Sequence, residues 1–179
     1  MSDSILIMNG EAMARALRRI AHEILEHNPD PGGFCLVGIP SRGVELARRL
    51  GDLIEAIEGR KPDLGSIDVS MHRDDLRIRN TLTSVHETRL PLHLEELTVV
   101  LVDDVLYTGR TCRAAMDAIT SFGRPARIQL AVLLDRGHRE LPIRPDYVGK
   151  NWPTSRVERV KVRLQNVDKE PDSVRVERP

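Results

Sequence analysis

The chain has 179 residues, of which 40% are hydrophobic and 30% charged, and its 27 basic side chains balance 27 acidic ones. This composition excludes a disordered chain, and the length suits one α/β domain with a substantial buried core. Aromatic residues make up only 3%, which argues against a stacking platform for single-stranded nucleic acid, and the balanced charge means that RNA binding would need a local basic patch.

The cysteines and the apolar runs indicate the compartment. Cys35 falls in a predicted core strand and Cys112 in a predicted helix, so we expect two buried free thiols in a reduced cytosol rather than a disulfide or a metal site. The apolar run near the N-terminus covers only residues 5–8, and no segment approaches the roughly 20 residues of a membrane span. The sequence therefore predicts a cytoplasmic protein that does not enter the membrane.

A first helix is predicted over residues 11–27, with Asn9 as its N-cap. Apolar side chains at steps of three or four form one face of this helix: Met13, Leu17, Ile20, Ala21 and Ile24. Basic side chains at similar steps form another face: Arg15, Arg18, Arg19 and His22. From the pattern alone, a solvated face is the simpler interpretation of these basic residues, and His22 could equally be hydrogen-bonded to a neighbour.

A strand, a loop and a second helix follow the turn at residues 28–33. The strand is predicted over residues 34–39, and the apolar face of the helix is formed by Leu46, Leu50, Leu53, Ile54 and Ile57. The loop between them contains Ser41, Arg42 and Gly43. Arg42 suits either a local cap or ion pair or an anion contact, and its spacing does not decide between them.

The middle of the chain is less regular. Residues 59–65 are predicted as a loop and residues 66–71 as a short strand. From residue 72 to residue 94 the hydrophobic periodicity is lost and charged residues accumulate. A stretch of this length without regular structure in a compact domain is usually functional or mobile.

Residues 98–111, with the sequence TVVLVDDVLYTGRT, combine a strand, an acidic pair and a loop. Residues 98–102 are rich in Val and predict a strand that is buried on both faces. Asp103 and Asp104 stand where that strand should end, and a helix is predicted after them from the apolar spacing of Thr111, Ala115, Ala118, Ile119 and Phe122. In an open α/β sheet, this order of elements places a ligand site at the carboxyl edge.

Each residue type in this loop suits one part of a sugar phosphate. The unpaired N–H groups at a helix N-terminus bind phosphate, Gly109 allows the backbone to approach it, and Thr108 and Thr111 can donate further hydrogen bonds. Ionised carboxylates only accept hydrogen bonds, so Asp103 and Asp104 suit vicinal sugar hydroxyls. The alternative is an ordinary strand-to-helix turn with an acidic tip.

Three further segments complete the chain. A strand is predicted over residues 127–134, and the loop after it, Asp135 to His138, is expected on the ligand side of the sheet. Residues 144–148 lead into Gly149, and residues 160–164 alternate between apolar and basic, which predicts a strand with one wet face. The tail after Asp168 is polar and is expected to be frayed or an edge strand.

The string VDDVLYTGRT resembles the motif by which type I phosphoribosyltransferases bind phosphoribosyl pyrophosphate (PRPP), and its wording is most similar to that of the PyrR family. The segments LVGIPSRGVELARRL, HRDDL, QLAVLLDRGHRELPIR and DYVGKNWPTS agree with this family. The resemblance covers nearly the whole chain. It implies a single domain over residues 1–179 with the type I phosphoribosyltransferase α/β fold, in which a central, mainly parallel twisted sheet is flanked by helices and carries a flexible hood at about residues 72–95.

The resemblance also implies a reaction, in which uracil and PRPP give UMP and diphosphate. The implied catalytic residues are Arg42, Arg73, Asp103 and Asp104. The implied PRPP- and UMP-binding residues are Ser41, Arg42, Asp103, Asp104, Val105, Leu106, Tyr107, Thr108, Gly109, Arg110, Thr111 and Arg136. Magnesium is expected to be bound mainly through PRPP and diphosphate oxygens, so we expect no metal site made by the protein alone. The family usually has Tyr at the position of His72, so the contact that Arg73 makes there could differ.

Regulation is the second activity that the resemblance implies. PyrR proteins bind the leader of pyrimidine-operon (pyr) mRNA when UMP is present and so cause transcription attenuation, and the matching candidates for RNA contact here are Arg18, Arg19 and His22. A homodimer or a larger homo-oligomer is expected.

Two alternative functions predict different residues. One is a phosphoribosyltransferase for orotate or a purine without an RNA-binding role. Relatives that use 6-oxopurines have Asp at the position of Tyr107, and orotate and adenine enzymes usually have Glu-Asp in place of Asp103 and Asp104. The other is an unrelated nucleotide hydrolase, which would need a Walker lysine or a Rossmann glycine triplet, and the sequence has neither.

Overall fold

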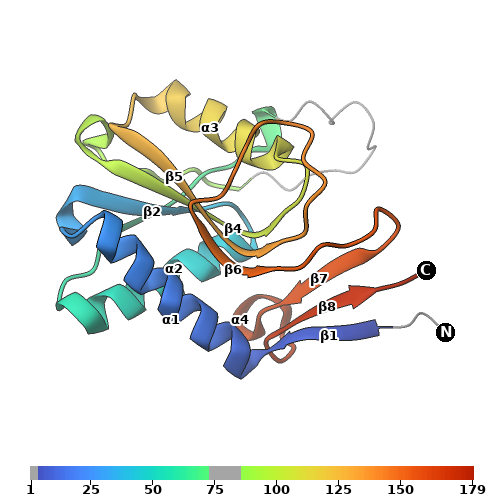
Figure 1. The fold of residues 1–179 in the computed structure, drawn as a ribbon. Helices are drawn as coiled ribbons and strands as arrows, with labels where there is room; N and C mark the ends of the chain where they lie inside the picture. Colours follow the sequence, from blue (N-terminus) through green and yellow to red (C-terminus); the bar gives the residue numbers. More distant parts are fainter. Residues whose placement is uncertain (1–3, 73–85) are drawn as a thin grey trace.

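The computed structural model describes residues 4–72 and 86–179, and these form two β-sheets with helices packed against the larger one (Figure 1). The larger sheet has five strands in the order β3-β2-β4-β5-β6, and all its pairings are parallel. Its strands are β2 (Phe34–Gly38), β3 (Asp63–Ser66), β4 (Thr98–Leu106), β5 (Arg127–Asp135) and β6 (Tyr147–Asn151). This arrangement confirms the predicted parallel sheet.

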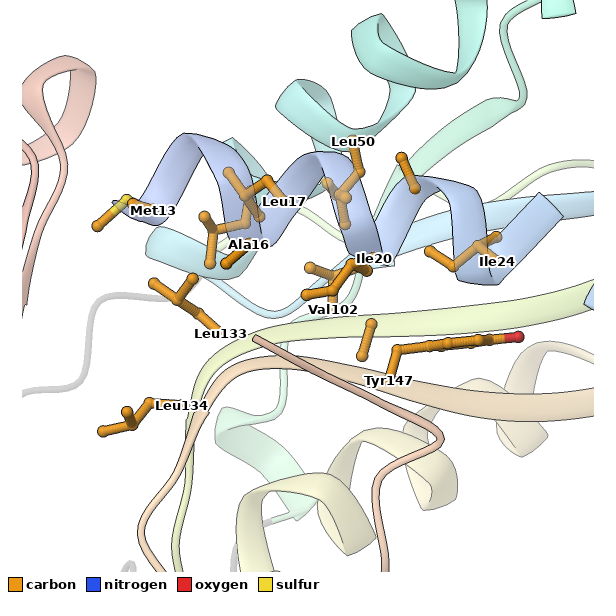
Figure 2. Close-up of a cluster of buried hydrophobic side chains, with 14 of the residues drawn as sticks. Met13, Ala16, Leu17, Ile20, Ile24, Leu50, Val102, Leu133, Leu134 and Tyr147 are labelled. Atoms are coloured by element: carbon orange, nitrogen blue, oxygen red, sulfur yellow. The ribbon is translucent and has the colours of Figure 1, made fainter. Parts of the chain in front are cut away.

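Helices cover both faces of the parallel sheet, as expected for strands that are buried on both sides. The helices α1 (Gly10–His27) and α2 (Arg42–Glu58) lie on one face, and α3 (Arg110–Phe122) lies on the other (Figure 1). Figure 2 shows Met13, Leu17, Ile20 and Ile24 of α1 lying over the sheet side chains, among them Tyr147. All five apolar residues predicted to face the core from α1 are buried, and the Asn9 side chain accepts a hydrogen bond from the Ala12 N–H at 2.9 Å, as an N-cap does.

The smaller sheet is antiparallel and has the strand order β1-β8-β7. Its strands are β1 (Ser4–Asn9), β7 (Arg159–Arg163) and β8 (Ser173–Glu177), and the short helix α4 (Gln165–Asp168) connects the last two. The prediction that the tail after Asp168 is frayed or an edge strand is wrong, because β8 is the middle strand. Its Val174 and Val176 are buried, and both of its edges are hydrogen-bonded.

The structure also corrects three local predictions. The predicted strand at 66–71 is displaced, since β3 ends at Ser66 and the 3₁₀ helix η2 (Ser70–His72) occupies the end of that range. The strand β4 continues through the acidic pair to Leu106 instead of ending before it. Phe122 is 62% exposed, because α3 ends at that residue and the chain does not cover it there, and Ile57 near the end of α2 is also exposed.

The hood predicted at about residues 72–95 lies largely outside the described residues, since 73–85 are not described. Within its described part, Arg89 pairs with Ser66 in an isolated antiparallel bridge, and a short 3₁₀ helix, η3 (Leu94–Glu96), precedes β4. A further 3₁₀ helix, η1 (Pro31–Gly33), precedes β2. Within the described ranges, no helix is both long enough and apolar enough to cross a bilayer.

Candidate active site

Three strand ends meet at the carboxyl edge of the parallel sheet and bring the predicted site residues together. β2 leads through residues 39–41 into α2, β4 leads through residues 107–109 into α3, and β5 leads into the loop at residues 136–146. β4 is the middle strand, with β2 on one side and β5 on the other. Parallel neighbours place their carboxyl ends at one edge, so these loops are adjacent in space.

Two glycines allow the first turn of α2 to pack directly on the sheet. A Cβ atom on Gly43 would overlap the Val102 carbonyl oxygen, and one on Gly38 would overlap the backbone of Val44. Neither glycine could therefore carry a side chain without moving the helix or the strand. This close approach places Ser41 and Arg42 beside the end of β4, where the acidic pair lies.

The acidic pair is half-buried, and each carboxylate is anchored to the strand. Asp103 Oδ1 accepts a hydrogen bond from the Asp104 N–H, and Asp104 Oδ1 accepts one from the Val105 N–H, both at 2.8 Å. Burial raises the pKa of the Cys112 thiol to about 12, and the charge of Asp103 is the next cause. Asp104 instead contributes to raising the pKa of Arg42. Asp103 thus influences the first turn of α3, and Asp104 influences the first turn of α2.

The loop before α3 turns at a glycine. Gly109 is the residue before the helix and has φ 92°, a left-handed conformation that glycine adopts without strain. Gly109 has no side chain to cap the helix, and the Arg110 N–H donates to Thr108 Oγ1 at 3.3 Å. The start of a helix with this partial positive charge suits an anion. A cavity of about 290 Å³ lies here, and its lining includes Asp103, Thr108 and Thr111. The other predicted lining residues are Val105, Leu106, Tyr107, Gly109 and Arg110.

The loop after β5 fixes this turn from the other side. The Glu140 N–H donates to the Thr108 carbonyl oxygen at 2.9 Å, and Arg139 Nη1 donates to the Tyr107 carbonyl oxygen at 2.9 Å. Arg110 Nε donates to Glu140 Oε2 at 2.7 Å. Sequence reasoning did not identify Arg139 or Glu140, because both lie about 30 residues from the turn that they hold and no local pattern marks them.

Arg136, predicted to lie near the base, is buried, and most of its N–H donors are hydrogen-bonded to other residues of the chain. Its guanidinium donates to Thr154 Oγ1 at 2.8 Å and to the carbonyl oxygens of Ser155 and Glu158 at 3.0 and 2.9 Å. The plane of the guanidinium lies over the Tyr107 ring, with 4.2 Å from its carbon to the ring centroid. Arg136 therefore connects the loop at residues 154–158 to Tyr107, the residue before the turn that is expected to bind phosphate.

The structure places the other predicted residues as follows. Ser41 is exposed at the start of α2, and Arg42 is the first residue of that helix, where it pairs with Asp168. Hydrogen bonding to Asp168 is the largest cause that raises the pKa of Arg42. Arg73 lies outside the described residues. Arg42 thus forms an ion pair, but with a residue 126 positions away in the sequence and not with a local partner.

The basic face of α1 is exposed but not uniform. Arg19 forms an ion pair with Glu23 and donates to the carbonyl oxygens of Val148 and Gly149 at the edge of the parallel sheet. Arg18 and His22 lie one turn apart and are exposed, and neither makes a hydrogen bond or ion pair within the described parts of the chain. Arg19 is therefore anchored, whereas Arg18 and His22 present their side chains outward.

The two aspartates of the site suit a magnesium ion whose other ligands are water and substrate oxygens. Among residues 4–72 and 86–179, no group of three or more His, Cys, Asp or Glu side chains could hold a metal ion. Asp103 and Asp104 nevertheless supply hard carboxylate oxygens at the sheet edge. Magnesium commonly binds one or two carboxylates and otherwise water and substrate phosphates, so this donor set is suitable.

The chain is similar to known proteins over most of its length. The family described as "Phosphoribosyl transferase domain" matches residues 6–165. A "Bifunctional protein PyrR" from Roseiflexus sp. (strain RS-1) is 56% identical over 168 residues, which cover 94% of this chain and 92% of the relative. One from Listeria monocytogenes serotype 4b (strain CLIP80459) is 54% identical over 177 residues, which cover 97% of each chain.

Solved structures agree with the fold. The hypoxanthine phosphoribosyltransferase of Trypanosoma cruzi has a TM-score of 0.72 with this chain and is 19% identical in sequence, and the match covers 97% of this chain and 96% of that one. At that identity, the likeness concerns the fold alone.

Proposed function

The chain belongs to the phosphoribosyl transferase domain family and, within it, to the PyrR proteins, and on this premise we propose that it is a uracil phosphoribosyltransferase that also regulates pyrimidine genes through RNA. In the reaction, a bond forms between uracil N1 and the anomeric carbon of PRPP. The bond from that carbon to diphosphate breaks, and uracil N1 loses its proton. The observation that carries the proposal is the single cavity that joins Asp103 to the turn from Thr108 to Thr111.

The 5′-phosphate is held at the start of α3. We infer that backbone N–H groups of the first turn bind it there, and the positive end of the helix dipole favours an anion at this position. Glu140 and Arg139 hold the turn in place through the carbonyl oxygens of Thr108 and Tyr107, so its N–H groups need little rearrangement when a phosphate binds. A site fixed in advance costs less to organise during the reaction.

The acidic pair accepts hydrogen bonds from the ribose hydroxyls. Asp103 and Asp104 each use one oxygen to accept a backbone N–H, which fixes the carboxylates relative to β4. Their negative charge also stabilises the positive charge that builds on the sugar as its bond to diphosphate breaks. Asp103 and Asp104 are the residues that would hold a magnesium ion, which would neutralise charge on the diphosphate.

The diphosphate and the base occupy the two neighbouring loops. Ser41 and Arg42 lie at the start of α2, where backbone N–H groups and the guanidinium favour the leaving group. Tyr107 and Arg136 lie toward the base. Tyr107 has no carboxylate to interact with a purine ring nitrogen, which supports uracil rather than a 6-oxopurine.

Release of diphosphate tests the transferase. The full chain is incubated with PRPP and magnesium together with uracil, hypoxanthine or orotate, and the nucleotide product is identified. We expect UMP from uracil, and turnover with hypoxanthine or orotate but not uracil would reject the assignment. The double substitution Asp104→Asn and Thr108→Ala should lower kcat/KM at least 100-fold, a loss in the range for groups that stabilise a transition state.

A matched control is available on α3. Asp117 and Thr120 are exposed residues of that helix and lie away from the turn. The double substitution Asp117→Asn and Thr120→Ala removes the same functional groups and should leave kcat/KM unchanged. Equal activity of the two double variants would contradict the proposed site.

The RNA-binding surface is proposed to include Arg18, Arg19 and His22 on α1. Arg18 and His22 are exposed and one turn apart, and anchoring of Arg19 to β6 fixes the orientation of the helix beside the sheet. Cationic side chains at such spacing suit phosphates of an RNA backbone. UMP at the sheet edge would then shift the protein toward the form that binds the pyr mRNA leader.

A titration with pyr leader RNA, with and without UMP, tests this surface. The double substitution Arg18→Ala and His22→Ala should weaken binding about 10-fold or more and reduce the dependence of affinity on salt. Arg15→Ala is the control, because Arg15 is on the same helix but pairs with Glu11. Uracil turnover should be unchanged in both variants, and RNA affinity that is unchanged in the double variant would remove α1 from the interface.

We also infer that the chain acts in the cytoplasm, as one domain over residues 1–179 and as a homodimer or larger homo-oligomer. Two copies would provide a broader surface for RNA than one copy does. Light scattering after size-exclusion chromatography measures the assembly, and a monomer at working concentration would contradict this part of the proposal. Unfolding in a single transition supports one domain.

A further inference from the structure

Arg42, the arginine at the start of α2, is held from one side by a carboxylate of the C-terminal segment. Arg42 Nε donates to Asp168 Oδ2 at 3.1 Å, and Arg42 Nη2 donates to Asp168 Oδ1 at 2.7 Å. The Asp168 side chain is only 9% exposed, whereas that of Arg42 is 31% exposed. A two-point contact of this kind fixes the plane of a guanidinium as well as its position.

The contact leaves the other edge of Arg42 for a ligand. A guanidinium has five N–H donors, and Asp168 uses one on Nε and one on Nη2. Both hydrogens of Nη1 and one of Nη2 remain. The hydrogen bond to Asp168 is the largest cause that raises the pKa of Arg42, and the charge of Asp104 in the acidic pair raises it further.

Asp168 is itself held rigidly. The Leu164 N–H donates to Asp168 Oδ2 at 2.8 Å, and Arg163 Nη1 lies 3.4 Å from Oδ1. Burial alone would raise the pKa of Asp168, but the hydrogen bonds from Arg42 and from the Leu164 N–H outweigh burial, and the pKa lies below its ordinary value. The carboxylate is therefore ionised at neutral pH and can orient a cation.

We propose that Asp168 is a positioning residue of the diphosphate subsite, which holds Arg42 so that its remaining edge faces the diphosphate of PRPP. This inference rests on the proposed function. Without Asp168, the long side chain of Arg42 would sample many rotamers, and ordering it would reduce the affinity for diphosphate. Asp168 touches neither the substrate nor the reacting atoms, and it acts through Arg42.

The chain provides a matched control two turns farther along α2. Arg49 donates to Asp172 through Nη1 at 2.5 Å and through Nη2 at 3.1 Å, and Asp172 also accepts the Gln165 N–H at 2.9 Å. This pair ties α2 to the same C-terminal segment in the same way. Arg49 lies seven positions after Arg42 on the helix, about 10 Å along the axis, and is therefore away from the site.

The test compares Asp168→Asn with Asp172→Asn in the full chain. We measure KM for PRPP and kcat with saturating uracil, the dissociation constant of inorganic diphosphate with magnesium, and the melting temperature. Asp168→Asn should raise KM for PRPP and the dissociation constant of diphosphate roughly 10-fold, with a smaller change in kcat. Asp172→Asn should leave both constants unchanged, although the melting temperature falls in both variants. Equal effects of the two substitutions on KM would overturn the proposal, since Asp168 would then act only through stability.

A double variant tests whether Asp168 acts through Arg42. In Arg42→Ala, adding Asp168→Asn should change the diphosphate affinity no further, and a further 10-fold loss would show that Asp168 does not act through Arg42. If Asp168→Asn does not fold, Arg42→Lys replaces it, because lysine keeps the charge but cannot form the two-point contact. Arg42→Lys should then raise KM for PRPP about as much as Arg42→Ala, and a wild-type KM would overturn the proposal.

Failure of the proposed function gives a different result. A wild-type chain that binds diphosphate but does not turn over uracil and PRPP would reject the transferase assignment. The comparison of diphosphate affinities would still decide the role of Asp168.

Discussion

Gly43 in the first turn of α2 lies so close to Val102 in β4 that a Cβ atom on the glycine would overlap the Val102 carbonyl oxygen. The next residue of β4 is Asp103, and the residue before Gly43 is Arg42. One backbone contact thus sets the distance between the acidic pair and the start of α2. The parts of the site that are proposed to bind ribose and diphosphate are positioned by the same contact.

Gly43→Ala should therefore reduce both stability and activity. The added methyl group forces α2 away from β4, and overpacking of this kind costs about 1–3 kcal/mol in the free energy of unfolding. KM for PRPP should rise as Arg42 moves. Gly33→Ala is the control, because the nearest atom to its Cβ is 4.0 Å away, and its unfolding free energy should stay within about 0.5 kcal/mol of wild type. Denaturant titration measures both, and a neutral Gly43→Ala would show that the contact is not required.

A buried polar group between α1 and the sheet predicts a graded loss of stability. Asn28 Nδ2 donates to Gln129 Oε1 at 2.9 Å, and the Tyr147 hydroxyl donates to the same oxygen at 3.0 Å. Asn28→Ala removes the donor that also bonds the Ile24 carbonyl oxygen and should cost about 1–3 kcal/mol, whereas Tyr147→Phe leaves Asn28 and Gln129 paired and should cost about 1 kcal/mol. Chemical denaturation of both variants checks the order, and a larger loss in Tyr147→Phe would contradict it.

The lowered pKa of Glu45 on α2 predicts that the free energy of unfolding depends on pH. Hydrogen bonding from Arg48 lowers the pKa of Glu45 from 4.5 to about 2; burial opposes this shift, and Arg49 and Asn166 add to it. Because the folded-state pKa lies below the unfolded one, the contribution is fully present above about pH 4.5 and is lost as the pH falls toward about 2. Glu45→Gln should lower the unfolding free energy by about 1 kcal/mol at pH 7 and by less at pH 3.

Unfolding free energies at pH 7, 4.5 and 3 measure this dependence. Glu11→Gln is the control, since Glu11 is exposed and its one ion pair among the described residues is with the exposed Arg15. A gap between wild type and Glu45→Gln that stayed constant over this range would refute the role of the ionised Glu45.

The two cysteines should be unreactive in the folded protein. Cys35 and Cys112 are buried, and burial raises the pKa of each thiol to about 12. The thiolate is the reactive form, so a thiol reagent at pH 8 should label neither residue until denaturant is added, after which both should react. Thr120→Cys, at an exposed position on α3, should label at once and shows that the reagent is active. Rapid labelling of the native wild-type chain would mean that the core opens.

The sequence predicted the elements whose signal is local. The Asn9 cap, the apolar stripe of α1 and the strand–loop–helix units around β2 and β4 follow from spacing within one element, and each is present in the structure. The cavity at the start of α3 is lined by Asp103 and by Thr108 to Thr111 of the motif, but Asp104 is not among its lining residues.

The remaining features depend on contacts between distant parts of the chain. The pair of Arg42 and Asp168 joins residues that are 126 positions apart, and nothing near either residue marks the other. The segment Ser173–Glu177 looks like a polar tail because its alternation is short, yet it is buried between two strands that come from elsewhere in the sequence. Exposure of Phe122 likewise depends on where α3 ends relative to the sheet.

The central place of β8 in the small sheet has a consequence for biosynthesis. Ser4 lies opposite Glu177, so β1 cannot pair with β8 until the chain between them has been translated. The parallel sheet can assemble on the nascent chain in the meantime, but Asp168 reaches Arg42 only when this late segment arrives. A translation product that stopped near residue 160 would thus carry the sugar-phosphate turn without the anchor of its arginine.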